Sequence, residues 1–180
     1  MLWRTHVVAG LNALWLLAPL PHVLTPDTVG LLAAAAGVGA LLPDLDAARS
    51  KIRSLDIHGI RPLVPLSDAL YQTFGHRGLL HAPAGWLAFG LPCLALSFWW
   101  GREPSLGLFL GYGSHLLADG ATRAGIPSAG LYPWLVRTRR LHLLPRRLRV
   151  VTGSLAEDAI FPLLASGALL LLLRFLTPSA

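Results

Sequence analysis

The residues of this chain that could do chemistry are histidines and aspartates at the ends of apolar segments. His115 and Asp119, in the stretch HLLAD, stand four residues apart. On a helix this spacing puts both side chains on one face, where an imidazole and a carboxylate can bind one metal ion together. The alternative is an ordinary pair on a helix surface. Because ionisable groups in long apolar segments are rare and costly, the position favours metal binding.

Two further stretches, LLPDLD and GHRGLLHAP, carry the same residue types. Asp44 and Asp46 repel each other unless a cation or an arginine lies between them; the alternative for either one alone is a polar cap at a helix end. His76 and His81 open an apolar segment, and Arg77 beside them could hold a phosphate oxygen. The alternative for Arg77 is an ordinary basic residue of a loop.

Composition indicates which elements must position these residues. Hydrophobic residues make up 54% of the 180-residue chain and charged residues only 13%, about half the charged share of a typical soluble protein. This balance is that of a membrane protein, and in lipid the apolar segments must pair their backbone groups internally, as helices do. We expect a single domain over 1–180, an all-α integral membrane bundle of about five transmembrane helices, formed by residues 5–21, 28–43, 80–100, 105–119 and 158–176.

The five segments differ in length. Those at 80–100 and 158–176 approach the ~20 residues that a helix needs to cross a bilayer core. Those at 28–43 and 105–119 are shorter and rich in glycine and alanine. Small residues let helices approach closely, so we expect these two in the centre of the bundle, spanning the membrane fully or only in part.

The distribution of basic residues predicts the orientation. If the N-terminus is inside and all five segments cross, every one of the 15 Lys and Arg residues except Arg102 and Arg174 lies on the inner side. This is a strong positive-inside signal. We therefore expect a multi-pass protein of a bacterial-type inner (cytoplasmic) membrane, with the N-terminus and the polar site facing the cytoplasm. A retained first helix is favoured over a cleaved signal peptide, because no clear small-x-small motif follows residues 7–20.

This topology brings a potential ligand from each helix to the inner face. The expected metal ligands are His6, Asp44, Asp46, His76, His81, His115 and Asp119. The set contains no thiolate, since the single cysteine lies in an apolar run, and it suits one or two divalent ions, zinc first and manganese or iron as alternatives. Two metals bridged by a carboxylate commonly activate water for hydrolysis of a phosphoester.

Glu157 opens the last apolar segment and has two interpretations. It could act at the inner face as a general base or a further ligand, which makes Glu157 and Arg77 the candidate catalytic residues. Its spacing from Ser154 in SLAE favours instead a capping box at the start of a helix.

Two loops on the inner side are more than simple linkers. Residues 62–74 could form a short amphipathic piece on the membrane surface, and RLRVV at 147–151 could be extended. Residues 131–150 interleave Tyr132 and Trp134 with six arginines, which predicts contact with membrane lipids through their anionic headgroups or with an anionic substrate. Ordinary flanking charge is the alternative. We expect no nucleic-acid partner, because the arginines adjoin membrane helices, and the sequence indicates no oligomeric state.

As a set, these stretches resemble the YdjM family, inner-membrane-associated proteins described as metal-dependent hydrolases and as LexA-regulated. The resemblance rests on THVVAG, GALLPDLD, GHRGLLH, TGSLAE, and HLLAD followed by Thr122, Gly125 and Pro127. It implies a multi-helix membrane protein whose metal ligands are drawn from the seven residues named above. Leu80 and Ala82 stand where the family's usual HRGxTHS stretch carries hydroxyl residues. The order Asp…His…HxxxD is also similar to the helical superfamily of zinc-dependent phospholipases C and single-strand nucleases, which favours phosphoester chemistry.

Three functions fit these observations. The first is a hydrolase that acts on a lipid-type phosphoester at the cytoplasmic membrane face. The second is a non-catalytic metal-binding membrane protein, such as an ion sensor or a transporter component, although a transporter would place its ligands near the bilayer midplane. The third is a regulatory scaffold whose basic loops hold a cytosolic partner, for which alanine at His115 or Asp119 would leave function intact. We favour the hydrolase because the ligands converge.

Overall fold

The computed structural model describes residues 1–47, 50–128 and 139–177, which form a mostly helical bundle. The prediction of an all-α fold is confirmed. The α-helices are α1 (Trp3–Ala13), α2 (Pro26–Gly39), α3 (Val64–Phe74), α4 (Pro83–Trp100), α5 (Arg102–Gly120) and α6 (Leu155–Leu176). Short 3-10 turns lie at Leu14–Leu17, Leu42–Asp46, Leu79–His81 and Arg146–Leu148, and strand β1 (Ile126–Pro127) pairs antiparallel with β2 (Arg140–Leu141).

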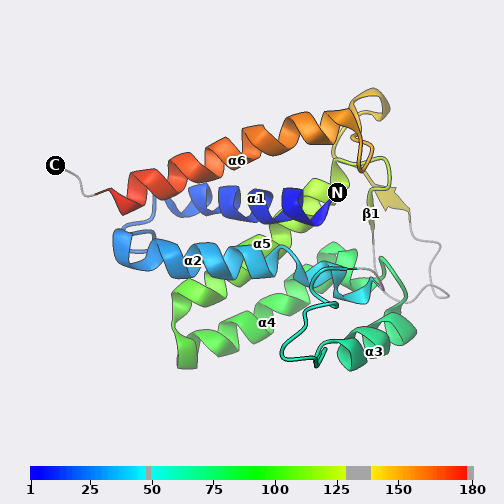
Figure 1. The fold of residues 1–180 in the computed structure, drawn as a ribbon, viewed down its shortest axis with the longest axis horizontal. Coiled ribbons are helices and arrows are strands. Elements are labelled where there is room, and N and C mark those ends of the chain that lie inside the picture. The colour runs from blue at the N-terminus through cyan, green and yellow to red at the C-terminus, as the bar shows by residue number, and fades with distance from the viewer. Residues whose placement is uncertain (48–49, 129–138, 178–180) are drawn as a thin grey trace.

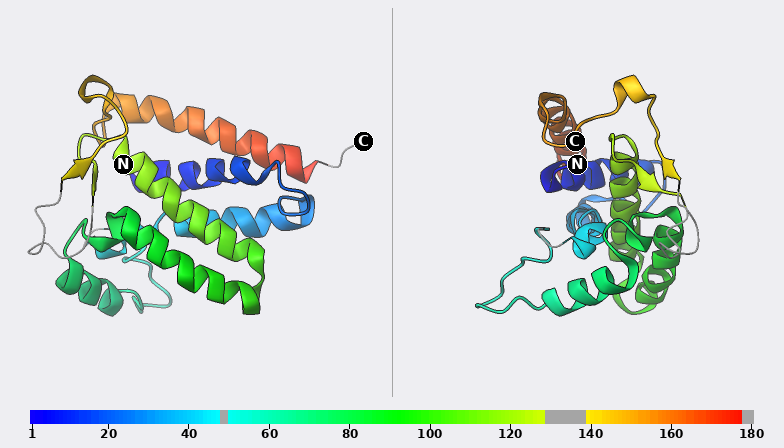
Figure 2. Two further views of the ribbon diagram at one scale, coloured as in Figure 1. Left: turned by 180° about the vertical axis from the view of Figure 1, so that it is seen from behind. Right: turned by 90° about the vertical axis from the view of Figure 1, so that its right-hand side faces the viewer.

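The helices are arranged around α5. Figure 1 shows α6, α1 and α2 running side by side, with the N-terminus, the start of α6 and strand β1 at one end of the bundle. α5 packs against α1, α2 and α4. Seen from behind, α4 and α5 lie next to each other (Figure 2). They are joined at Gly101, whose φ of 90° lies in a region that glycine adopts without strain.

Helix boundaries differ from the predicted ones where proline and capping residues intervene. The segment predicted as helix over 5–21 is α-helical only to Ala13 and ends in a 3-10 turn, because Pro19 and Pro21 cannot continue the helix. α2 begins earlier than expected, at Pro26, since the Thr25 backbone N–H donates to Thr28 Oγ1 in a capping box.

The two loops that we expected on the inner side are partly as predicted. Residues 62–74 contain α3, which confirms a short helical piece there. Residues 147–151 are not a strand: they begin in a 3-10 turn, and only Val150 forms a bridge, with Thr122. The aromatic part of the basic loop, with Tyr132 and Trp134, lies outside the described residues.

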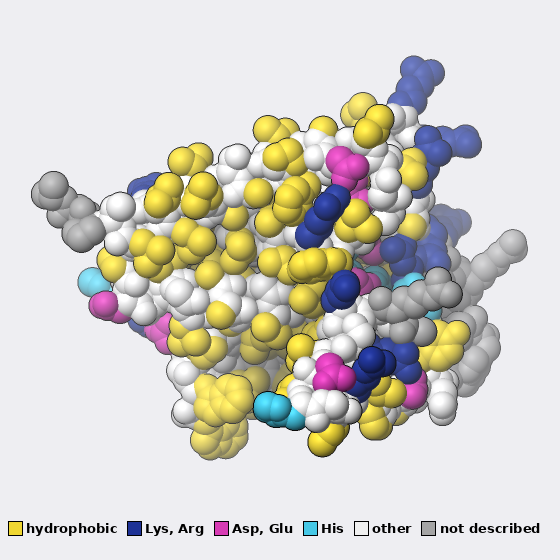
Figure 3. Space-filling model, in the orientation of Figure 1, with side chains coloured by type: hydrophobic (Ala, Val, Ile, Leu, Met, Phe, Trp, Pro, Cys, Tyr) yellow, Lys and Arg dark blue, Asp and Glu magenta, His cyan; other side chains and the backbone are white. Residues whose placement is uncertain are grey.

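Within the described ranges, two stretches are long and apolar enough to cross a membrane. They are Pro26–Asp46, with a mean hydropathy of 1.6, and Leu155–Leu176, with 2.1. The bundle of five membrane-spanning helices is therefore not confirmed; α1, for one, has only 11 residues, fewer than the ~20 that a crossing requires. Only 11% of the Leu155–Leu176 window is buried, and Figure 3 shows hydrophobic side chains covering this side of the bundle.

α2 and α5 meet backbone to backbone. A Cβ on Gly111 would overlap the carbonyl oxygen of Ala36, and a Cβ on Gly39 would overlap that of Leu108. A Cβ on Gly10 of α1 would lie 2.7 Å from the same Ala36 oxygen. The prediction that the two Gly- and Ala-rich segments lie at the centre is confirmed, because only residues without a bulky side chain allow this approach.

Replacing Gly111 with alanine should lower stability strongly. The new methyl group meets a backbone carbonyl of α2, which cannot rotate away, so the helices must separate. We expect a loss of about 1–3 kcal/mol, seen as a fall of several degrees in the midpoint of thermal unfolding in detergent. Gly30→Ala is the matched control, because a Cβ on Gly30 of α2 meets nothing within 4 Å. Equal midpoints for the two variants would contradict the close contact.

Candidate metal centre

Histidine and aspartate side chains converge at the end of the bundle where the chain begins, which is the end marked N in Figure 1. They come from the start of α1, the 3-10 turn after α2, the 3-10 turn before α4 and the last turns of α5. Two groups of three lie close enough to hold an ion: His6, His115 and Asp119, and Asp44, His81 and His115. The structure therefore brings five of the seven predicted ligands into two overlapping groups.

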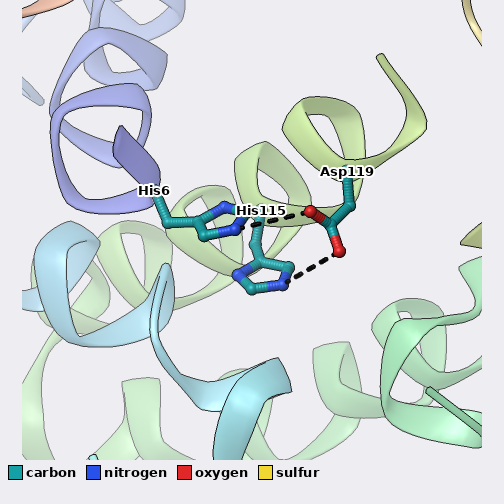
Figure 4. Close-up of side chains that lie close together, drawn as sticks. All are labelled: His6, His115 and Asp119. Atoms are coloured by element: carbon teal, nitrogen blue, oxygen red, sulfur yellow. Dashed lines mark ion pairs between the residues drawn. The ribbon is translucent and has the colours of Figure 1, made fainter. Parts of the chain in front are cut away.

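The first group lies between α1 and α5 (Figure 4). His6 Nε2 is 3.5 Å from Asp119 Oδ1, and His115 Nε2 is 3.9 Å from Asp119 Oδ2. The rings of His6 and His115 are stacked, with centroids 3.7 Å apart. All three side chains are at most 1% exposed, so the helical spacing of HLLAD does place the imidazole and the carboxylate together.

The second group joins α5 to the turns after α2 and before α4. Asp44 Oδ1 lies 3.4 Å from His81 Nε2 and 3.9 Å from His115 Nε2. His115 Nε2 is thus common to both groups. A neutral imidazole nitrogen has one lone pair and binds one ion at a time, so the two groups could hold either one shared ion or two ions of which only one uses His115.

A backbone contact sets the orientation of His115. Its Nδ1 lies 2.7 Å from the carbonyl oxygen of Ala40. Because a carbonyl oxygen only accepts hydrogen bonds, Nδ1 must carry the proton. The lone pair is then on Nε2, which is buried and has no hydrogen-bond partner in the part of the chain that the structure describes. A metal-binding histidine is usually fixed by a second contact of this kind.

Asp46 and His76 lie beside the two groups rather than within them. Asp46 Oδ1 is 3.1 Å from His76 Nδ1, and Asp46 Oδ2 accepts the backbone N–H of Arg77 at 3.0 Å. His76 is 47% exposed, whereas Asp46 is buried. Arg77 has a φ of 57°, a strained conformation for a side-chain-bearing residue, and its guanidinium lies 3.0 Å from Asp119 Oδ2. Of the two residues predicted as ligands here, His76 therefore lies at the exposed edge of the centre and Asp46 lies buried behind it.

Glu157 lies at the start of α6 and contacts backbone groups. Its carboxylate oxygens accept the N–H of Leu2 at 2.6 Å and of Gly153 at 2.8 Å. The expected capping box with Ser154 is not formed: Ser154 Oγ has no hydrogen-bond partner among the described residues, and Glu157 accepts the N–H of Gly153 instead of that of Ser154. The structure thus places Glu157 where it holds the start of α1, the helix that carries His6.

Sequence reasoning missed the backbone groups that position the centre. The carbonyl of Ala40 holds His115, and the carbonyl of Leu80 accepts a hydrogen bond from the hydroxyl of Tyr112 at 2.7 Å, which ties the His81 turn to α5. Every residue carries such groups, so no residue type signals them. Tyr112 was the one visible sign, as a polar ring three residues before His115.

Metal binding should depend on pH through His81, which precedes α4 and lies outside both candidate membrane stretches. Burial alone would lower the pKa of His81, but the carboxylates of Asp44 and Asp46 outweigh burial and raise it from 6.5 to about 9. A protonated imidazole cannot bind a metal. The apparent zinc affinity should therefore rise about tenfold per pH unit between pH 7 and pH 9 and then level off.

Titration with chelator-buffered zinc at several pH values measures this slope. The stability of the metal-free protein should change with pH in the opposite direction. Protonated His81 stabilises the fold fully below its ordinary pKa of 6.5, and this stabilisation is lost as the pH rises through about 9. His142→Gln, a change outside the two groups, should keep the slope. A pH-independent affinity in the unaltered protein would contradict the role of His81.

Comparisons with known proteins identify a family and several relatives. A family model described as YdjM inner membrane protein matches residues 1–177. The uncharacterised protein YvsG of Bacillus subtilis is 32% identical over 162 residues, which cover 89% of this chain and 87% of YvsG. The inner membrane proteins YdjM of Escherichia coli and Shigella flexneri are each 34% identical over 122 residues, which are 59% of this chain but only 52% of theirs. No solved structure matches the chain.

Proposed function

The chain belongs to the YdjM family of inner membrane proteins, and from this premise we propose that it is a membrane-bound, metal-dependent hydrolase. In this proposal the metal centre faces the cytoplasm, the protein crosses the membrane several times, and the substrate is a phosphoester of the lipid type. Family membership supports the membrane location. The activity, the substrate and the orientation belong to the proposal.

The observation that carries the proposal is a set of buried nitrogen atoms that have no hydrogen-bond partner among the residues described. Nε2 of His115 is in this state 3.9 Å from the carboxylates of Asp44 and Asp119. Both ring nitrogens of His81 are as well, at 3.4 Å from Asp44 and 3.5 Å from Asp46. A buried polar atom left without a partner costs about 1–3 kcal/mol, and a divalent cation would satisfy these atoms. The nitrogen and oxygen donors fit zinc best.

A bound ion would supply a Lewis acid, which polarises a phosphoryl oxygen and makes a water molecule more acidic. His76 and Arg77, at the exposed edge of the centre, suit the two remaining tasks, which are proton transfer and phosphate binding. His76 is exposed, and its Nδ1 faces Asp46, so its Nε2 is left to give a proton to the leaving oxygen of a substrate. The carboxylate of Asp46 behind it holds the ring in place.

Arg77 is placed to hold the phosphate. Its guanidinium is 21% exposed and pairs with Asp119 at 3.0 Å, so it lies between the buried ligands and the open edge. A guanidinium can bind two phosphate oxygens at once. The strained backbone of Arg77 is held by the hydrogen bond to Asp46, which fixes the point from which the side chain extends.

The test is metal analysis followed by a substrate screen. Protein purified in detergent should contain about one or two zinc, manganese or iron ions per chain. It should hydrolyse a soluble phosphodiester or a short-chain phospholipid. His76→Ala should keep the metal and lose at least about 100-fold in kcat, whereas His22→Ala, an exposed histidine at the other end of the bundle, should change neither.

Two results would overturn the proposal in different ways. Stoichiometric metal without hydrolysis of any phosphoester would favour the second function, a metal-binding membrane protein without catalysis. No stoichiometric metal, even after incubation with each ion, would remove the centre itself.

A further inference from the structure

Four arginines line a hollow at the same end of the bundle as the metal centre. They are Arg123, which follows α5, and Arg146, Arg147 and Arg149 in the segment that leads to α6, and the hollow encloses about 430 Å³. Figure 3 shows Lys and Arg side chains gathered at this end. None of the four belongs to the two metal-binding groups.

The four guanidinium groups have no acidic partner among the residues that the structure describes. Arg149 donates from Nε to the carbonyl oxygen of Leu144, which leaves its charge uncompensated. By contrast, five arginines elsewhere in the described residues each lie near a carboxylate: Arg4, Arg53, Arg61, Arg77 and Arg102. Four like charges around one small hollow repel each other, and an anion bound between them relieves the repulsion.

The backbone of the hollow is fixed to the end of α5. The N–H of Arg123 donates to the carbonyl of Val150 at 2.9 Å, and the N–H of Val150 donates to Ala121 at 3.0 Å. The N–H of Leu143 donates to Gly120 at 2.8 Å. These bonds hold the segment with three of the arginines against the turn that carries the fourth. Backbone hydrogen bonds therefore fix the position of the four arginines relative to one another.

Apolar side chains beside the hollow indicate its position relative to a membrane surface. Leu148, between Arg147 and Arg149, is 66% exposed, and Leu155, the first residue of α6, is 87% exposed. α6 is the more apolar of the two stretches that could cross a membrane. The arginines therefore stand a few residues before a candidate membrane helix, at the level where lipid headgroups begin, with leucines beside them that can enter the acyl region.

We propose that this hollow is a binding site for the phosphate of an anionic phospholipid headgroup. Guanidinium groups bind phosphate oxygens in pairs, and basic pockets on the cytoplasmic side of membrane proteins attract anionic lipid. Exposed leucines among the arginines suit a lipid and would be out of place on a surface for nucleic acid. The site goes beyond the proposed hydrolase function, because it uses none of the metal-binding residues.

The experiment is lipid retention by purified full-length protein. Protein in detergent is mixed with short-chain phosphatidylglycerol, with phosphatidylcholine, or with inorganic phosphate, and bound ligand is measured by native mass spectrometry. The test variant is Arg146→Gln/Arg147→Gln. The control is Arg139→Gln/Arg140→Gln, which removes the same charge from exposed arginines that do not line the hollow. Thermal unfolding confirms that both variants fold, and Arg123→Gln provides a second, independent test variant.

We expect the unaltered protein to retain phosphatidylglycerol and not phosphatidylcholine. The Arg146/Arg147 variant and Arg123→Gln should each bind it at least about tenfold more weakly, and the control should bind it as before. If the test and control variants lost phosphatidylglycerol binding equally, the proposal of a specific site would be wrong, and the binding would come from the overall positive charge of this end of the protein. Equal affinity for inorganic phosphate and for the lipid would overturn the lipid assignment, as would stronger competition by an RNA oligonucleotide. Retention in the His115→Ala variant separates this site from the metal centre.

Discussion

Replacing His115 with alanine abolishes stoichiometric metal binding. His115 Nε2 is the one donor common to both groups that could hold an ion, so its loss leaves each group with only two ligands. We expect the zinc affinity to fall by at least about 100-fold, because even changes to residues that only support a ligand cost 10–100-fold. Elemental analysis after dialysis against a weak chelator measures the bound ion, and hydrolysis should fall with it.

The comparison between His115→Ala and His6→Ala makes this expectation specific. His6 belongs to one group only and stacks on the His115 ring, so its loss should reduce the metal content less. His22→Ala should retain all of it. A His115→Ala protein that unfolds at the same temperature as the unaltered protein and still binds one ion per chain would show that the groups do not share a donor.

Glu157→Gln lowers both stability and metal affinity, although Glu157 is in neither metal-binding group. The side chain is fully buried and accepts two backbone N–H groups, from Leu2 and Gly153. An amide keeps one accepting oxygen and turns an NH₂ group toward the other N–H. An unsatisfied buried donor costs about 1–3 kcal/mol, which lowers the midpoint of thermal unfolding by several degrees.

The expected loss of metal affinity follows from the position of Glu157 beside the start of α1. Leu2 immediately precedes α1, and His6 lies in its first turns, so a displaced start of α1 moves this ligand. We expect zinc affinity to fall about tenfold. Asp158→Asn is the matched control, because the neighbouring carboxylate is 48% exposed and pairs with Arg4 at the surface, where a salt bridge contributes little. If the two variants had the same unfolding midpoint and zinc affinity, Glu157 would have no positioning role.

Most of the helical fold could be predicted from the sequence, because runs of apolar residues of this length fold as helices in either lipid or a protein core. The ends of those helices were less predictable. Pro19 and Pro21 stop the first helix well before the apolar run ends, whereas Thr25 starts the second before its run begins. Membrane crossing was predictable only in part, since a segment such as α1 is apolar but short.

The candidate site shows the same division. His115 and Asp119 could be placed together because helical geometry fixes their relation. His6, from the other end of the chain, could be grouped with them only by assuming a topology that placed helix ends on one face. The separate role of Glu157 could not be predicted, since SLAE is an ordinary capping pattern and its partner Leu2 is 155 residues away.

The backbone contact between α2 and α5 has a consequence for which ions the centre accepts. Asp44 follows α2, and His115 and Asp119 extend from α5, so the gap between these donors is fixed by how closely the two helices lie. At Gly111 and Gly39 nothing compressible separates the helices. The two helices therefore cannot come closer to draw these donors around a smaller cation, so two glycines that touch no donor set a lower limit on the size of the ion that the proposed centre would bind.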